Sequence, residues 1–371
     1  MLLNHAFTAL ATLTFAFSVA AQVPAPMTPS EPSKVMKIVL PTDNDALLKG
    51  DFQSFFMFVD RNFENQVTTP WEGGQYGYVR GPLRLGSQVV LMHFHEGIDI
   101  APVKRDAKGE PIDEVRSISD GEVVYVLQAP GGSNYGRYVV IKHDWGQGPV
   151  FSLYAHLSKI TAQVGQKVVP GTPIGIMGHT GSGLDRRRSH VHLEINLFVS
   201  SRFSEWHEKY FKPSPNPHGV YNGLNLTGLD VTGFYLTLQK NPTLTVAEFV
   251  KSIEPTWKAI VPRKGELELL KNYPWLSSET GEAGASPSWQ ISFSDSGLPI
   301  SVEPSKQVVT APVVVWVKNR GMPHSYYTRG HVGGSGDVGT LTGSGARYLE
   351  LILGDFPTPA PVVPVKLAPK K

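Results

Sequence analysis

The stretch HFHEGIDIAP, residues 93–102, sets histidines and carboxylates into a run that otherwise has the composition of a buried strand. In an extended chain alternate side chains share a face, so His95 and Asp99 emerge together and Glu96 points the opposite way. The glycine between them and the β-branched residue after it favour a strand over the helix of an H-E-x-x-H zinc protease. Glu96 is therefore not the expected general base.

Short β-like runs continue outward from this stretch and dominate residues 91–200. Glycine turns separate them at intervals of about ten residues, which is typical of an antiparallel sheet stack or barrel. The expected strands are GIDIAP, GEVVYVL, RYVVIKH, VFSLYAHL, PIGIMG and VHLEINLFV. The sequence predicts a mainly β core with an antiparallel, barrel-like arrangement.

Histidines cluster in this β-rich part of the chain. Seven of the twelve fall within residues 93–192: His93, His95, His143, His156, His179, His190 and His192. The run SHVHLEI places His190 and His192 on one face of a strand, and a second strand with His95 and Asp99 could converge with it on one cation. Zinc is expected, because two imidazoles and one carboxylate form a catalytic set that leaves a fourth position for water.

Composition narrows the class of protein. The chain has 371 residues, 41% of them hydrophobic and 18% charged, so it can bury a large core and form two or three domains. Its net charge of +2 does not indicate a nucleic-acid binder. With no cysteine there is no disulfide, no thiolate ligand and no lipobox.

An apolar run near the start of the chain ends in small residues at positions 19–21, which predicts a secretory signal peptide over residues 1–21. An uncleaved membrane anchor is the alternative, since the first residues lack Lys and Arg. We expect export to the periplasm, the cell envelope or the medium, with no stable membrane insertion after cleavage.

The composition and patterning of residues change along the part expected to be exported. The expected segments are a Pro-rich linker at 22–36, an N-terminal segment packing on the core at 37–85, the histidine-rich core at 86–200, a C-terminal α+β accessory domain at 201–355, and a Pro-rich tail at 356–371. In the accessory domain we expect short helices over Val246–Ile253 and in GELELLKNYPWL, and strands in WQISFSD, APVVVWVKN and RYLELILGD. Its aromatic patches fit core packing better than carbohydrate stacking.

Three motifs now stand in order along the core: HEGIDI, YAHLS at 154–158, and HVHLEI. In this combination the sequence resembles the lysostaphin-type (LytM-type) zinc metallopeptidases, which cleave peptide bonds in bacterial cell-wall peptidoglycan. The stretch VGQKVVPGTPIGIMGHTGSG is similar to that family's turn-rich segment. The resemblance covers roughly residues 86–200 and implies a core of the duplicated hybrid motif type.

The resemblance also implies roles that spacing leaves open. It makes His95, Asp99 and His192 the ligands of one zinc ion, and His156 and His190 two catalytic histidines that do not bind it. The alternative is a polar cluster at a sheet edge. An imidazole suits work on the water and the oxyanion, because it titrates near neutral pH.

The implied function is a secreted zinc metalloendopeptidase that hydrolyses stem or cross-link peptides of peptidoglycan. The alternative is a catalytically silent wall-binding or hydrolase-activating protein on the same fold, but such members typically lose ligands and this chain keeps all five residues.

Residues and segments outside the three motifs have expected positions as well. His93, His143 and His179 are expected at the rim or in structural positions, and the arginines of LDRRRS in a solvated turn or against an acidic part of a substrate. The segment 68–82 and the accessory domain either cover sheet edges or lie across the groove and hold the enzyme latent.

Overall fold

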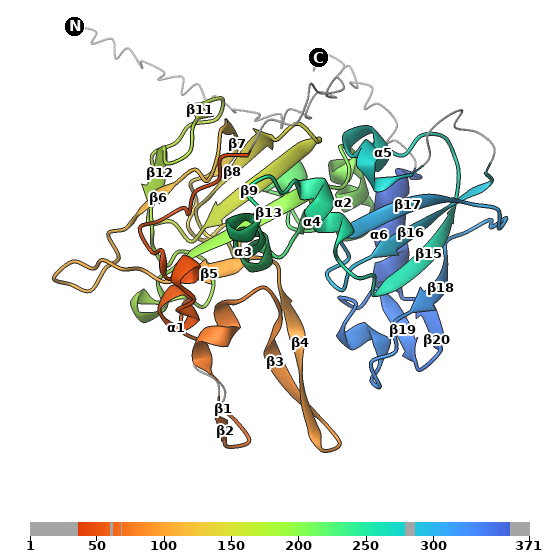
Figure 1. Ribbon diagram of the computed structural model, residues 1–371, viewed down its shortest axis with the longest axis horizontal. Coiled ribbons are helices and arrows are strands. Elements are labelled where there is room, and N and C mark those ends of the chain that lie inside the picture. The colour runs from red at the N-terminus through yellow and green to blue at the C-terminus, as the bar shows by residue number, and fades with distance from the viewer. Residues whose placement is uncertain (1–35, 60–61, 68, 279–285, 357–371) are drawn as a thin grey trace, which may run out of the picture.

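The computed structural model describes residues 36–59, 62–67, 69–278 and 286–356 (Figure 1). The expected signal peptide, and nearly all of the expected linker and tail, lie outside these residues. No helix within the described ranges is long and apolar enough to cross a membrane.

The central element is a seven-stranded antiparallel sheet in the order β11-β7-β8-β9-β13-β14, with β5 also paired to β13. Its strands are β5 (Ile98–Ile100), β7 (Gly121–Leu127), β8 (Tyr138–Asp144), β9 (Pro149–Ala155), β11 (Lys167–Val168), β13 (Val191–Phe198) and β14 (Leu226–Gly228). Every residue of β9 and β13 is buried, so these strands form the middle of the core. The sheet is open between β11 and β14, and the expectation of a barrel-like closure is wrong for the described part of the chain.

A smaller three-stranded sheet accompanies the central one. It has the order β10-β12-β6 and consists of β6 (Glu114–Arg116), β10 (Lys159–Ile160) and β12 (Pro173–Ile176). The six runs expected as strands from the sequence form β5, β7, β8, β9, β12 and β13, so the prediction of a mainly β antiparallel core is confirmed.

A long hairpin precedes this core and extends away from it at the bottom of Figure 1. It consists of β3 (Gly77–Leu85) and β4 (Gln88–His95), and β4 ends at the first histidine of HEGIDI. Shorter elements before it are η1 (Ala46–Lys49), α1 (Phe52–Phe55), β1 (Asn62–Phe63), β2 (Gln66–Val67) and η2 (Pro70–Gly74). The hairpin was not expected from the sequence.

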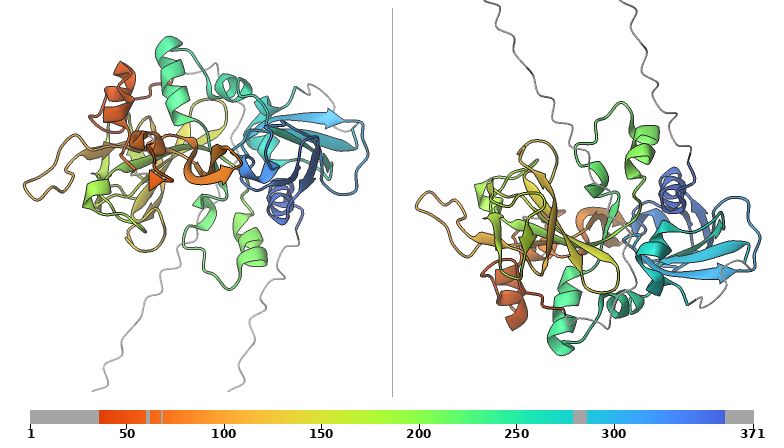
Figure 2. Two further views of the ribbon diagram at one scale, coloured as in Figure 1. Left: turned by 90° about the horizontal axis from the view of Figure 1, so that it is seen from below. Right: turned by 90° about the horizontal axis from the view of Figure 1, so that it is seen from above.

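The C-terminal half forms a four-stranded antiparallel sheet, β17-β16-β15-β18, which lies beside the central sheet in both views of Figure 2. Its strands are β15 (Trp257–Pro262), β16 (Ser288–Phe293), β17 (Pro299–Ser305) and β18 (Val313–Val317), followed by the hairpin of β19 (Val332–Ser335) and β20 (Val338–Leu341). The helices are α2 (Phe203–Phe211), α3 (Val231–Lys240), α4 (Val246–Lys251), α5 (Glu268–Asn272) and α6 (Gly343–Leu353). One continuous cluster of buried hydrophobic residues joins the two halves.

The run RYLELILGD corrects a prediction, because it forms most of helix α6 and not a strand. Thr342 caps the helix by accepting a hydrogen bond from the backbone of Gly345, and Gly354 ends it in a left-handed conformation. Tyr348, Leu349 and Ile352 are buried, and these positions i, i+1 and i+4 lie on one face of a helix. The N-cap Thr342 lies outside the quoted run, whereas Gly354, which ends the helix, is the eighth residue of the run, so the alternation of apolar residues before it was misleading.

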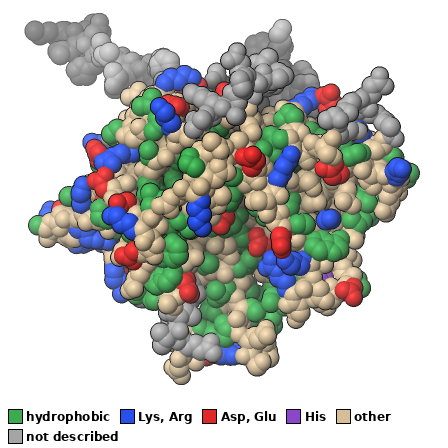
Figure 3. Space-filling model, viewed as in Figure 1, with side chains coloured by type: hydrophobic (Ala, Val, Ile, Leu, Met, Phe, Trp, Pro, Cys, Tyr) green, Lys and Arg blue, Asp and Glu red, His purple; other side chains and the backbone are tan. Residues whose placement is uncertain are grey.

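Basic and acidic side chains are interspersed over the face seen in Figure 3. This distribution matches the net charge of +2. The chemistry of the molecule therefore depends on local groupings of side chains.

Candidate functional site

Strand register brings the motif residues together. On β13, His192 lies directly opposite Asp99 of β5 on one side and Ala155 of β9 on the other. His95, at the end of β4, reaches the same point, where its Nε2 lies 3.1 Å from Asp99 Oδ1. One nitrogen or oxygen atom from each of His95, Asp99 and His192 lies within 4.8 Å of the others, and all three residues are buried.

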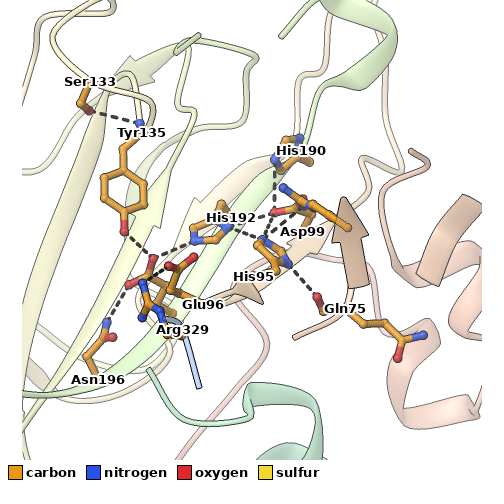
Figure 4. Close-up of polar contacts among 12 residues, drawn as sticks. Gln75, His95, Glu96, Asp99, Ser133, Tyr135, His190, His192, Asn196 and Arg329 are labelled. Atoms are coloured by element: carbon orange, nitrogen blue, oxygen red, sulfur yellow. Dashed lines mark hydrogen bonds and ion pairs between the residues drawn. The ribbon is translucent and has the colours of Figure 1, made fainter. Parts of the chain in front are cut away.

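In each of the two imidazoles of this group, the nitrogen that faces away from the other ring is hydrogen-bonded (Figure 4). His95 Nδ1 donates to the backbone oxygen of Gln75 at 2.7 Å, and His192 Nε2 donates to Glu194 Oε1 at 2.8 Å. The remaining nitrogens, His95 Nε2 and His192 Nδ1, face each other at 3.0 Å beside Asp99. Outer acceptors of this kind fix the tautomer that leaves a lone pair for a metal.

Glu194 was missed as a site residue by the sequence interpretation. Its carboxylate also accepts hydrogen bonds from Tyr135 at 2.7 Å and Asn196 at 3.0 Å, and the residue is 1% exposed. Burial alone would raise the pKa of Glu194, but the hydrogen bond and charge of His192, with those from Tyr135 and Asn196, bring it below its usual value. The available signal was the period of the strand, since position 194 shares the face of position 192.

His156 and His190 lie next to this group. His156 Nδ1 donates to Thr180 O at 2.8 Å, His190 Nδ1 donates to Arg188 O at 2.8 Å, and the two ring centroids are 4.6 Å apart. His190 Nε2 lies 3.3 Å from Asp99 Oδ1. In both histidines Nδ1 is occupied by a backbone oxygen, so Nε2 is the nitrogen that can take part in proton transfer, and in His190 this nitrogen also faces Asp99.

Backbone strain accompanies His156, which follows the end of β9. Its φ is +64°, an unusual value for a residue with a Cβ, and its N–H donates to Tyr135 O at 2.9 Å. Strained non-glycine residues of this kind persist where the surrounding structure fixes them, and they concentrate at functional sites.

The electrostatics favour an ionised carboxylate among the imidazoles. Burial would raise the pKa of Asp99, but His190, His95 and Arg80 hold it well below its usual range. Burial, followed by the neighbouring His190 and His192, holds the pKa of His156 well below that of a free histidine. For His192, burial lowers the pKa, but Asp99 and Glu194 outweigh it and raise the pKa to about 9.

The close approach of β13 to the motif glycine explains why a glycine stands there. A Cβ on Gly97 would lie 2.3 Å from Leu193 O, 2.8 Å from Glu194 Cγ and 3.0 Å from His192 Cε1. The absence of a side chain at Gly97 therefore lets β5 and β13 pair at the distance that joins the two motifs.

The other histidines singled out in the core are not in the cluster. His93 is exposed on β4, and His143 is buried between Asp120 O at 2.7 Å and Ser152 Oγ at 2.6 Å. His179 lies 3.0 Å from Glu110, which also pairs with Arg186 at 3.1 Å, so this arginine of LDRRRS has a partner within the chain.

Two further segments contact the site or its neighbours. The segment 68–82 supplies Gln75 O and also Arg80, whose guanidinium pairs with Asp99. Glu96 pairs with Arg329 of the C-terminal half. Arg80 was not anticipated by any motif.

Part of the chain is similar to known peptidases. Residues 93–203 match the family model "Peptidase family M23". The peptidoglycan DD-endopeptidase ShyA of Vibrio cholerae is 38% identical over 122 residues, covering 33% of this chain and 24% of that protein. An uncharacterized metalloprotease of Buchnera aphidicola is 28% identical over 141 residues, covering 37% of this chain and 33% of that protein.

Among solved structures, the catalytic domain of lysostaphin from Staphylococcus simulans is 27% identical, covering 33% of this chain and 75% of that domain, with a TM-score of 0.23. The chain thus spans between a quarter and a third of the length of the two full-length relatives. The part of the chain that matches the family model carries the histidine cluster.

Proposed function

We propose, from the match of residues 93–203 to peptidase family M23, that the protein is an exported zinc metalloendopeptidase of bacterial peptidoglycan. Its substrates would be the stem or cross-link peptides. The observation that carries the proposal is the convergence of His95, Asp99 and His192 with two further buried histidines beside them.

The donor set fits zinc. His95 Nε2, His192 Nδ1 and the Asp99 carboxylate provide two borderline-soft nitrogens and one oxygen, a combination typical of zinc sites that keep a position open. Gln75 O and Glu194 hold the outer nitrogens, so both lone pairs are already directed inward. A bound zinc ion would polarise the scissile carbonyl and acidify the attacking water.

His156 and His190 are the proposed catalytic histidines. Because Thr180 O and Arg188 O hold their Nδ1–H groups, each imidazole can use Nε2 to accept a proton when it is neutral and to donate one once it is protonated. One of them can take the proton of the nucleophile and return it to the leaving amine, while the other donates to the developing oxyanion. Glu194 acts through His192, whose orientation it fixes.

Purified peptidoglycan provides the test. We expect the full-length mature protein with zinc to release peptide fragments whose new ends, identified by mass spectrometry, show an amide bond cleaved. Replacing His95, Asp99 or His192 by Ala removes one of three ligands and should abolish stoichiometric zinc, whereas His156→Ala and His190→Ala should retain zinc and lose about a hundredfold or more in turnover.

Full zinc in all three ligand variants would refute the metal assignment. Loss of zinc in His190→Ala with retention in His192→Ala would reverse the two roles. A protein that binds peptidoglycan with zinc in place and cleaves none of it would instead fit the silent wall-binding or hydrolase-activating alternative.

A further inference from the structure

Arg80 of β3 brings a positive charge to the point where the candidate ligands meet. Its Nη2 donates to Asp99 Oδ2 and lies 3.3 Å from His95 Nε2, and its Nε donates to Gly73 O at 2.8 Å. Asp99 is almost fully buried, whereas a third of the Arg80 side chain is exposed. A guanidinium has no lone pair to share with a metal, so Arg80 is not a ligand but a second cation at the same carboxylate.

A β-bulge directs Arg80 to this side of the hairpin. Tyr78 pairs with Phe94 and Arg80 pairs with His93, so two steps along β3 correspond to one step along β4. Residues directly opposite each other share a face, and positions 93 and 95 share a face of β4. The extra residue therefore moves Arg80 from the face of Tyr78 to the face of His95, as bulges near functional sites commonly do.

The base of the hairpin is anchored, so Arg80 is presented from a fixed backbone. The Tyr76 hydroxyl donates to Gly228 O at 2.9 Å, and the Tyr78 hydroxyl accepts from the backbone N–H of Arg329 at 2.7 Å. The ring of Phe94 packs edge-on against both tyrosines, at centroid distances of 5.1 and 5.0 Å. Only the partly exposed arginine side chain needs to move for its guanidinium to leave the site.

We propose that Arg80 is a built-in competitor of the metal: it neutralises Asp99 while the site holds no cation, and it must leave when a divalent cation binds. The inference rests on the proposed metal site. Arg80 holds Oδ2 of Asp99, whereas Oδ1 faces the two imidazoles, so the competition rests on His95 Nε2. Both cations approach this nitrogen, and two positive charges there would repel each other strongly in a buried setting. Arg80 is tethered, so its effective concentration at the site is high at every metal concentration.

The competition has two linked consequences. Without Arg80, the metal-free protein keeps a buried carboxylate that has lost its guanidinium partner, so its fold is less stable. In the metal-bound form the variant is not less stable than the wild type, because the metal and not Arg80 is then the partner of Asp99. By linkage, the variant therefore binds the metal more tightly than the wild type. A hydrogen-bonded ion pair of this kind predicts a tightening of about tenfold to a hundredfold.

The test measures Zn²⁺ affinity of the full-length mature protein by competition with a chromophoric chelator. Arg80→Met is compared with Arg84→Met, the same substitution on the same strand, where Arg84 pairs with the exposed Glu64 away from the site. We expect a zinc Kd at least tenfold lower for Arg80→Met and unchanged for Arg84→Met. Thermal unfolding should show Arg80→Met below the wild type without zinc and level with it at saturating zinc.

A zinc Kd for Arg80→Met that is within twofold of the wild type, or weaker, overturns the competition. Should Arg80→Met fail to fold, Arg80→Gln keeps a hydrogen-bond donor toward Asp99 without the charge and is held to the same criterion. If neither the wild type nor the variants bind zinc, the metal site itself fails together with this inference. If the wild type cleaves peptidoglycan and Arg80→Met has the same zinc affinity as the wild type, the role of Arg80 is refuted and the proposed function stands.

Discussion

Glu194→Gln should weaken the metal site without touching any ligand. The carboxylate accepts from His192, Tyr135 and Asn196, and its charge favours the tautomer of His192 that carries the proton on Nε2. A glutamine amide has one acceptor oxygen and one donor NH₂, so it cannot accept from groups on both sides as the carboxylate does. If its NH₂ faces His192, the tautomer reverses and Nδ1 loses the lone pair that points to the metal.

The magnitude follows from the position of Glu194 behind a ligand. Loss of an outer partner of a metal-bound histidine typically reduces metal affinity tenfold to a hundredfold, which corresponds to about 1.4–2.8 kcal/mol. The 2.8 Å contact and the near-complete burial of Glu194 favour the upper half of this range, because water cannot replace the lost acceptor.

The assay is a zinc titration against a chromophoric chelator, with circular dichroism to confirm the fold. Glu96→Gln is the matched control, since Glu96 is a nearby carboxylate that pairs with Arg329 and not with a candidate ligand. Equal zinc affinity in Glu194→Gln and the wild type, at unchanged fold, would refute the idea that Glu194 sets the tautomer of His192.

Two further predictions concern the frame around the site. Gly97→Ala should destabilise the fold by about 1–3 kcal/mol and weaken zinc binding, because its Cβ would overlap Leu193 O at 2.3 Å; a denaturant midpoint equal to that of the wild type would contradict this. Burial lowers the pKa of His143 to about 4, against about 6.5 in an unfolded chain, so protons bind the unfolded state preferentially between these values. The free energy of unfolding should therefore carry no penalty from His143 above pH 6.5 and should fall by about 3 kcal/mol as the pH drops to 4. The variant His143→Gln should not show this loss. Identical pH profiles of chemical denaturation for the two proteins would refute this prediction.

Local patterns in the sequence were sufficient for the strands of the core. Alternation and glycine turns placed β7, β8, β9 and β13 within a few residues, because the period of a strand is a property of neighbouring positions. The same kind of local interpretation misassigned α6, because the N-cap residue Thr342 lay outside the run considered and Gly354 near the end of the run was not used as a helix-ending residue. The motifs also identified every histidine that the structure places in the cluster.

The sequence by itself thus determined which side chains share a face of one strand, and through the motif order it named the residues that could act together. The tertiary structure alone decided how strands far apart in the chain are registered: it set His192 opposite Asp99 and used a bulge to turn Arg80 toward the same carboxylate. Periodicity is local, whereas register depends on long-range pairing, and one extra residue in a strand reverses the face of all that follow. For this reason the candidate ligands could be predicted from the sequence and the arginine that meets them could not.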